Sequence, residues 1–320
     1  MMSRPSVIVI CAVALVARCS AGEPPKSGPY KVASKVYKVL ALDSSNQDLH
    51  VFWPSSPGAG ESFPLVSYMH GMSGGGIDIV AYRQLFKDMA SYGLVVVAPG
   101  GCGAITGKAC NDPVNSPYTD CAGLPSVSPK GWASYYGEGL KGLEWAKNMS
   151  ATEPAAKLVD WSVGVGICGH SMGGQAAALA SGAGCSKQWD IRAAALHHPA
   201  SGDIGAPGNI GVNISVPFAA FTTSGDGIWP ETRDIYFNSS STPRVYRDQV
   251  GFSHMEPLKL PAVKWYNPWL ATMTAAWFKL YLGGDSSSQW HSMIYNSSDP
   301  LSLCNYAGPK GMANCETVEQ

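Results

Sequence analysis

One serine lies in a sequence context that favours nucleophilic chemistry. Residues Gly169-His170-Ser171-Met172-Gly173 spell G-x-S-x-G. They follow an apolar run at 163–168, typical of a buried strand, and precede small residues at 174–182 that are typical of a helix. A serine on so sharp a strand-to-helix turn projects its hydroxyl from the edge of a sheet, and the backbone N–H of Met172 is then available to an oxyanion. The pattern predicts Ser171 as the nucleophile of an acyl transfer.

The same pattern occurs once more, around Ser73 in Gly71-Met72-Ser73-Gly74-Gly75. This match also follows a strand-like run, at 64–69, but consecutive glycines begin a helix poorly. It also comes early in the chain, before half of the expected sheet. We therefore favour Ser171 over Ser73.

A serine hydroxyl is a weak nucleophile at neutral pH and needs a base, normally a histidine that a carboxylate orients. Asp226 directly follows a strand-like run at 217–223, and His254 lies in a loop after the run at 244–250. The order serine, aspartate, histidine is the one found with this type of turn. We predict a catalytic triad of Ser171, Asp226 and His254.

Other titratable residues occupy less specific positions. Asp203, after the run at 191–196, is the alternative carboxylate. His291 is also late in the chain but lies beyond the last expected helix. We expect His50 to face solvent from a strand, and His170 to pack beneath the serine turn.

A second oxyanion donor is expected from the loop after an early strand. His70-Gly71-Met72 fits this position, with the Met72 N–H as the donor and Gly71 beside the substrate. No Gly-Lys-Ser/Thr follows, so the glycines do not indicate a phosphate loop. We expect Trp229 and His198 to line the substrate pocket, because each lies close to a strand end on the same side of the sheet.

No metal or other cofactor is expected. The adjacent pair His197-His198 invites a metal interpretation, but neighbouring side chains diverge on a strand. No Cys or His cluster has the spacing of a zinc site.

The elements that must position these residues alternate along the chain. The runs at 30–42 and 49–53 alternate apolar with polar residues and predict early antiparallel strands. Later strand-like and helix-like runs then alternate: strands at 63–69, 94–98, 163–168, 191–196, 217–223 and 244–250, and helices at 77–92, 136–149, 174–182 and 263–282. This order predicts an α/β fold with a mostly parallel central sheet and helices on both faces.

Two features of that pattern need comment. The run at 244–250 is expected to be the last strand, and Pro268 marks either the true start of the closing helix or a kink. The segment 100–129 is rich in Gly, Pro, Ser and Cys and has no period, so we expect a long loop that is functional or tied by disulfides.

Length and charge favour one secreted domain. The chain has 320 residues and a formal net charge of −1, which indicates neither a nucleic-acid partner nor an anionic membrane. Residues 1–21 have the basic start, short apolar core and small-residue end of a secretory signal peptide, a membrane anchor being the alternative. Residues 22–320 suit a single α/β domain with no transmembrane anchor. Nothing in the sequence indicates an oligomeric state.

Cysteines and glycosylation sequons agree with an extracellular location. Beyond the signal lie Cys102, Cys110, Cys121, Cys168, Cys185, Cys304 and Cys315. Cys168, inside a strand, is expected to be a buried free thiol, and Cys304 and Cys315 are expected to pair, which stabilises by about 3 kcal/mol. Pairing of the remaining four stays open. N-x-[ST] sequons occur at Asn148, Asn213, Asn238 and Asn296.

Together these motifs resemble one family. The chain is similar to the secreted cutinases and polyester hydrolases of the α/β-hydrolase fold, a group that includes poly(ethylene terephthalate) hydrolases and has chlorophyllases and dienelactone-hydrolase-like proteins as relatives. The matching segments, between Tyr30 and Cys315, are His70-Gly71-Met72, 169–174, Gly225-Asp226, Ser253-His254, Ala276-Trp277-Phe278-Lys279, Gly284-Asp285 and the Cys304/Cys315 pair.

The resemblance implies an α/β-hydrolase sheet, a shallow exposed cleft, no cofactor and hydrolysis of carboxylic esters. It implies an oxyanion hole from Met72 and Met172, and substrate contacts near Trp229 and His198. Two departures leave the substrate open: the long 100–129 segment, and His197-His198 where an aromatic residue is expected.

We therefore expect a secreted serine esterase acting on a small-molecule or polymeric ester. A chlorophyllase or lipase acting on large amphiphilic esters is one alternative. The other is a catalytically silent extracellular binding module, although such proteins usually lack a triad member.

Overall fold

The computed structural model describes residues 27–40, 46–71, 78–101, 121, 132–200, 210–227, 229–241, 243–283, 288–306 and 312–319. The expected signal peptide and most of segment 100–129 lie outside these residues, and so do Met72, Ser73, Cys102, Cys110 and Asp203.

The described residues form a nine-stranded sheet in the order β1-β2-β4-β3-β5-β6-β7-β8-β9. The strands are β1 (Val32–Leu40), β2 (Asn46–Pro54), β3 (Leu65–Met69), β4 (Val95–Pro99), β5 (Val165–His170), β6 (Ile191–His197), β7 (Phe218–Thr222), β8 (Arg244–Gln249) and β9 (Met312–Val318). The central strands from β4 to β8 are parallel, whereas β1, β2 and β9 pair antiparallel with their neighbours. The predicted α/β class and mostly parallel sheet are confirmed.

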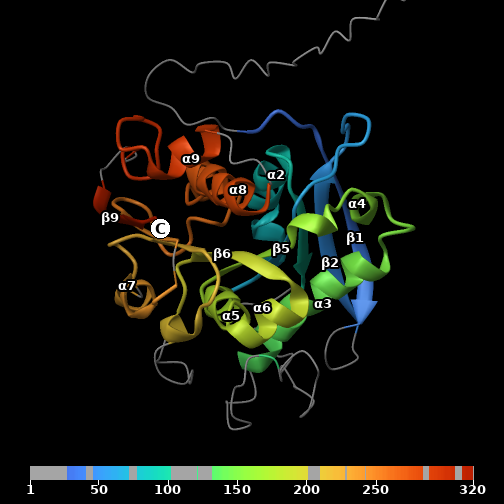
Figure 1. Cartoon of the computed structure of the whole chain (residues 1–320), viewed down its shortest axis with the longest axis horizontal. Helices are drawn as coiled ribbons and strands as arrows, with labels where there is room; N and C mark the ends of the chain where they lie inside the picture. The colour runs from blue at the N-terminus through green and yellow to red at the C-terminus, as the bar shows by residue number, and fades with distance from the viewer. Residues whose placement is uncertain are drawn as a thin grey trace, which may run out of the picture.

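Helices cover both faces of this sheet (Figure 1). They are α1 (Asp78–Ala81), α2 (Arg83–Ser91), α3 (Trp132–Asn148), α4 (Pro154–Lys157), α5 (Met172–Ala180), α6 (Ala183–Trp189), α7 (Trp229–Asn238), α8 (Pro268–Leu282) and α9 (Ser288–Tyr295), with 3-10 turns η2 (Trp161–Val163) and η3 (Ile210–Asn213). Helices α2, α8 and α9 pack on one face, and α3, α5, α6 and α7 on the other. No helix among the described residues is sufficiently long and apolar to span a membrane.

Strand β4 shows why the central strands read as continuous apolar runs. Val95 and Val97 point into the core beneath α3 and α5, while Val96 and Ala98 point into the core beneath α2 and α8. A strand covered on both faces has no polar side, so alternation disappears from its sequence.

The end of the sheet differs from the prediction. Strand β8 is followed by β9, which pairs antiparallel with it and places Cys315 opposite Arg247. The residues of β9 are at most half-buried, so its sequence carries no apolar run. The long helix at 263–282 begins only at Pro268, where the side chain of Asn267 caps it by accepting from the Trp269 N–H at 3.1 Å.

The expectation that His50 faces solvent is wrong. Its side chain lies on β2 and is only 3% exposed, in a strand against which α2 packs. Burial, helped by the nearby charge of Arg83, lowers the pKa of His50 to about 4. Both faces of β2 are covered, because Leu49 and Val51 lie in one core and Phe52, on the same face as His50, lies in the other.

Two disulfides tie the described residues together. Cys304 pairs with Cys315 as predicted, and Cys121 pairs with Cys185, which settles one pairing that the sequence left open. Cys168 is a buried free thiol, also as predicted. Disulfides are typical of oxidising compartments such as the extracellular space. The four sequon asparagines, Asn148, Asn213, Asn238 and Asn296, are exposed.

Candidate active site

The chemistry-bearing residues follow the ends of neighbouring parallel strands. Ser171 follows β5, His198 follows β6, Asp226 lies four residues after β7, and His254 lies five residues after β8. Because parallel strands end at the same edge of a sheet, these residues gather there.

The turn at Ser171 is strained and tightly packed. Its backbone has φ 58° and ψ −121°, a conformation that L-residues rarely adopt. A Cβ atom on Gly169 would lie 2.1 Å from the carbonyl oxygen of Gly173, and one on Gly173 would lie 2.2 Å from that of Met69. Only glycine fits at either position, as the G-x-S-x-G pattern requires.

Backbone hydrogen bonds hold the turn against β6. The Ser171 N–H donates to the His197 carbonyl at 2.9 Å, and the Ser171 carbonyl accepts from the Ala200 N–H at 3.1 Å. Met172 is the first residue of α5, where backbone N–H groups have no partner within the helix. The Met172 N–H, the predicted oxyanion donor, therefore lies in the first turn of α5, directly after Ser171.

The loop after β3 lies beside the serine. A Cβ atom on Gly71 would be 3.4 Å from the Cβ of Ser171. The Gly71 N–H itself donates to the hydroxyl of Tyr82 at 3.2 Å. The second expected oxyanion donor, Met72, comes next in the chain but lies outside the described residues.

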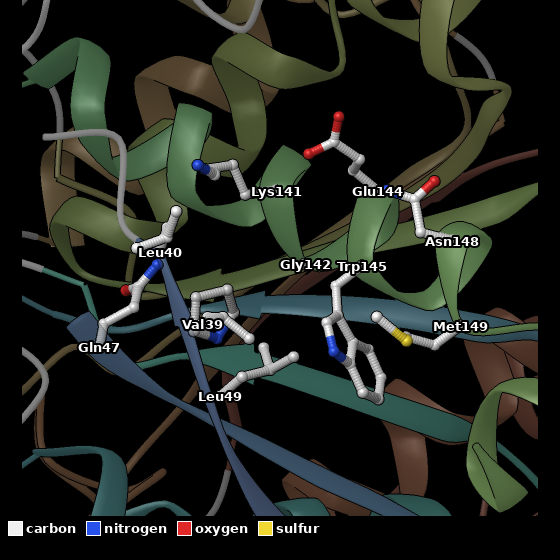
Figure 2. A pocket seen from close by; sticks show the side chains of 11 residues that line it. Val39, Leu40, Gln47, Leu49, Lys141, Gly142, Glu144, Trp145, Asn148 and Met149 are labelled. Carbon is white, nitrogen blue, oxygen red and sulfur yellow. The ribbon is translucent and has the colours of Figure 1, made fainter. Parts of the chain in front are cut away.

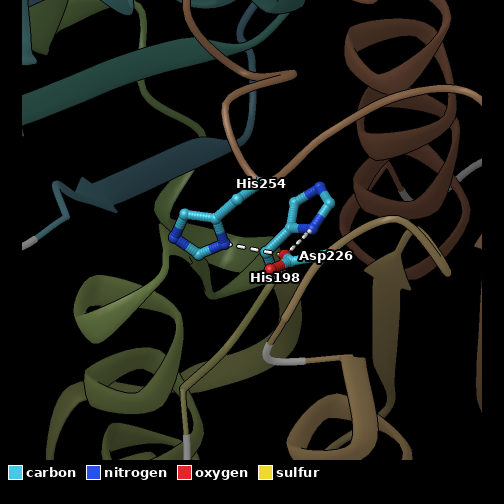
Figure 3. Close-up of side chains that lie close together, drawn as sticks. All are labelled: His198, Asp226 and His254. Atoms are coloured by element: carbon cyan, nitrogen blue, oxygen red, sulfur yellow. Dashed lines mark hydrogen bonds and ion pairs between the residues drawn. The ribbon is translucent and has the colours of Figure 1, made fainter.

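Asp226 and His254 are directly joined (Figure 3). Nδ1 of His254 lies 2.7 Å from Oδ2 of Asp226. The carboxylate side chain is 3% exposed and the imidazole 28% exposed. With Nδ1 donating to the carboxylate, Nε2 is the acceptor that a general base needs. Among the described residues, no hydrogen bond joins the Ser171 hydroxyl to this ring.

His170 connects the serine turn to the His254 loop. Its Nε2 lies 2.6 Å from the His254 carbonyl oxygen, and its Nδ1 lies 2.5 Å from the Tyr82 hydroxyl. A carbonyl only accepts, so Nε2 donates and Nδ1 accepts from Tyr82. Burial holds the pKa of His170 well below its ordinary value, which keeps the ring neutral. The prediction that His170 packs beneath the turn is confirmed.

His198 occupies the other side of Asp226 (Figure 3). Its Nδ1 lies 2.8 Å from Oδ2 of Asp226, and its Nε2 lies 2.9 Å from Oε1 of Glu256. The imidazole has no exposed surface. This placement does not fit the substrate contact that the resemblance implied, because the ring lies behind the carboxylate.

Glu256 was missed at the sequence level. It is only two residues beyond His254, but such a carboxylate carries no signal of its partner. Its side chain is 1% exposed. Only the fold shows that it bonds to a ring 58 residues away.

Two opposing effects set the protonation of this group. Burial alone would lower the pKa of His198, but its hydrogen bonds and ionic contacts with Asp226 and Glu256 outweigh burial and raise the pKa to about 9. Burial likewise tends to raise the pKa of Asp226, but hydrogen bonds from His198 and His254 hold it well below its ordinary value. His198 is therefore cationic and Asp226 anionic at neutral pH.

The same three residues do not suit a metal ion. One potential ligand atom each from His198, Asp226 and His254 lies within 4.8 Å of the others. Metal binding needs a deprotonated imidazole nitrogen, whereas both nitrogens of His198 face carboxylate oxygens. We assign no metal to this cluster.

A cavity elsewhere does not belong to this site. A groove of about 360 Å³ lies beside α3 and is lined by Val39, Leu49 and Trp145 among others (Figure 2). It contains no member of the Ser171, Asp226 and His254 group. Trp229, expected to line the substrate pocket, is the first residue of α7, and its side chain lies outside the described residues.

Comparison with known proteins did not identify a family for this chain. A scan against protein-family models found no match, and a search of the curated proteins found none either.

Proposed function

We propose that this protein is a serine hydrolase that cleaves carboxylic esters through a covalent acyl-enzyme. The observation that carries the proposal is the 2.7 Å contact between His254 Nδ1 and Asp226 Oδ2. It orients a partly exposed imidazole at the sheet edge where the strained Ser171 turn also lies. A nucleophile, a base and a carboxylate that orients the base are the parts that such a reaction needs.

In the first half-reaction, Ser171 Oγ attacks the ester carbonyl carbon while Nε2 of His254 takes the hydroxyl proton. Negative charge collects on the former carbonyl oxygen, where the Met172 N–H, and the expected Met72 N–H, stabilise it. The C–O bond to the alcohol then breaks, and His254 returns the proton to the leaving oxygen. Asp226 stabilises the imidazolium formed between these steps.

In the second half-reaction, water loses a proton to His254 and attacks the acyl carbon. The bond to Ser171 breaks, Oγ recovers a proton from His254, and the carboxylic acid leaves. The hydrogen bond between Ser171 and His254 must form for both halves. Such bonds are often long or poorly aligned in the resting enzyme and shorten when substrate binds.

The substrate is proposed to be a small-molecule or polymeric ester outside the cell. The disulfides and the exposed sequons support secretion. Rates on soluble esters, emulsified lipid, chlorophyll and polyester film would separate a cutinase-like enzyme from a lipase or chlorophyllase.

The decisive experiment compares the purified wild-type protein with Ser171→Ala on short p-nitrophenyl esters and with a fluorophosphonate probe. We expect Ser171→Ala to lose activity by roughly 10⁴-fold or more and to lose labelling, with its thermal midpoint retained. Ser73→Ala, in the other G-x-S-x-G, should still be labelled. A wild-type protein that neither hydrolyses esters above the mutant nor reacts with the probe would instead be a binding module.

A further inference from the structure

Asp226 receives two imidazoles on a single oxygen. Oδ2 lies 2.7 Å from Nδ1 of His254 and 2.8 Å from Nδ1 of His198. A triad needs only the first of these contacts. The second comes from a ring with no exposed surface, so it touches neither substrate nor solvent. A buried polar contact of this kind calls for a physical explanation.

The far side of His198 shows what the contact is for. Its Nε2 faces Oε1 of Glu256 at 2.9 Å. A neutral imidazole has one donor and one acceptor nitrogen, while an ionised carboxylate only accepts. Both ring nitrogens donate at once only when the ring carries a positive charge, as its raised pKa also indicates. Asp226, His198 and Glu256 thus form a buried row of alternating charge.

Hydrogen bonds to Asn267 hold Glu256 against the start of α8. Its Oε2 accepts from Nδ2 of Asn267 at 2.8 Å, and its carbonyl accepts from the Asn267 N–H at 2.9 Å. Nδ2 of Asn267 also donates to Oε1 of Gln249 at 3.1 Å. Because Asn267 also caps α8, the row ends on a rigid element.

Other titratable groups surround His198. The rings of His254 and His170 have centroids 5.6 and 5.9 Å from its own. His197, Asp248 and Arg247 also interact electrostatically with members of this row. Burial lowers the pKa of both His170 and His197, so His198 is the cation nearest to the imidazole of His254 among these rings.

We propose that His198 and Glu256 are positioning residues that hold Asp226 and set the lower pH limit of the reaction. The inference rests on the proposed function. The His198 cation competes with His254 for the same carboxylate oxygen and repels a second positive charge on His254. Removal of the His198 charge should therefore change the acid limit of the reaction, which the variants below measure.

The test variant is Glu256→Gln. A glutamine amide donates to an unprotonated Nε2 of His198 while its oxygen still accepts from Asn267, so the hydrogen bonds survive and the charge row is lost. We expect the acid limb of the kcat/KM–pH profile on a p-nitrophenyl ester to move up by about one pH unit. The double variant with His198→Gln should match Glu256→Gln, and His198→Gln alone, which keeps the Glu256 carboxylate, should move the limb up at least as far.

A matched control removes a similar pair from the surface. His291 and Glu319 are hydrogen-bonded to each other and about half exposed. Glu319→Gln should leave the acid limb where it is in the wild type.

Nitrogen NMR provides a readout independent of turnover. In the wild type at pH 7.5, both ring nitrogens of His198, assigned by their loss in His198→Gln, should show the shifts of a doubly protonated ring. In Glu256→Gln, Nε2 of His198 should show the chemical shift of an unprotonated ring nitrogen. A neutral His198 ring in the wild type, or a folded Glu256→Gln variant whose acid limb coincides with that of the wild type, would overturn the inference. An inactive wild-type protein with a cationic His198 would contradict the proposed function and, with it, the role in setting a pH limit. The row of alternating charge formed by Asp226, His198 and Glu256 would still stand.

Discussion

His254 and His198 present the same chemical group to the same oxygen in two different regions of the molecule. Their contacts with Asp226 differ by only 0.1 Å. One ring lies at the rim and is 28% exposed, whereas the other lies in the interior and is fully buried. The rim histidine keeps Nε2 for chemistry, while the interior histidine gives Nε2 to Glu256. Surroundings, not residue type, separate a candidate base from a fixed cation.

The largest expected difference comes from removing each ring in turn. His254→Ala should reduce kcat by roughly 10⁵–10⁶-fold, because the serine loses its base. Its thermal midpoint should change little, because the ring is partly exposed. His198→Ala should instead lower the free energy of unfolding by about 3–5 kcal/mol, because it leaves two buried carboxylates facing each other.

Measurement of kcat and of urea unfolding for both variants decides this point. The comparison fails if His198→Ala unfolds like the wild type, or if His254→Ala keeps its turnover.

Removing the shared carboxylate should affect both regions together. Asp226→Asn should lower kcat by about 10⁴-fold, because the amide favours the wrong tautomer of His254. It should also destabilise the fold, because the buried His198 cation loses a partner. Ester hydrolysis and thermal melts provide the two readouts, and Asp234→Asn on the exposed side of α7 is the control. A loss of activity without any loss of stability would show that His198 does not depend on Asp226.

The smallest predicted effect is a pH dependence of stability. The pKa of His198 is raised to about 9 in the folded protein, from 6.5 as the ordinary value. Its contribution is therefore fully present below pH 6.5 and is lost as the pH rises through 9. The loss amounts to at most about 3 kcal/mol.

Urea unfolding of the wild type and His198→Gln between pH 6 and 9.5 measures this contribution. The free energy of unfolding of the wild type should fall more steeply with pH than that of the variant. Parallel curves would mean that His198 is not charged in the folded state.

The residues of the proposed triad were predictable for a local reason. Ser171, Asp226 and His254 each come shortly after an apolar run, and the runs proved to be β5, β7 and β8. The glycines around Ser171 also had a purely local cause, since the turn leaves no space for a Cβ atom. The same argument placed His198 at the correct edge of the sheet. It predicted a substrate contact for this residue, however, and not a buried position beside Asp226.

The misses share one cause. β9 has no apolar run because it is an edge strand of half-buried residues, and it is recognisable only by its pairing with β8. The burial of His50 depends on α2, which lies across β2. In each case the deciding contact joins segments that are distant in the chain.

Residue spacing established the alternating strands and helices, the strained serine turn and the order of the candidate triad, because each depends on neighbours within a few positions. It was the packed sheet that put His198 between Asp226 and Glu256, residues 28 and 58 positions away. Charge and burial at that point arise from three loops meeting at one edge, and periodicity along a chain does not record which loops meet.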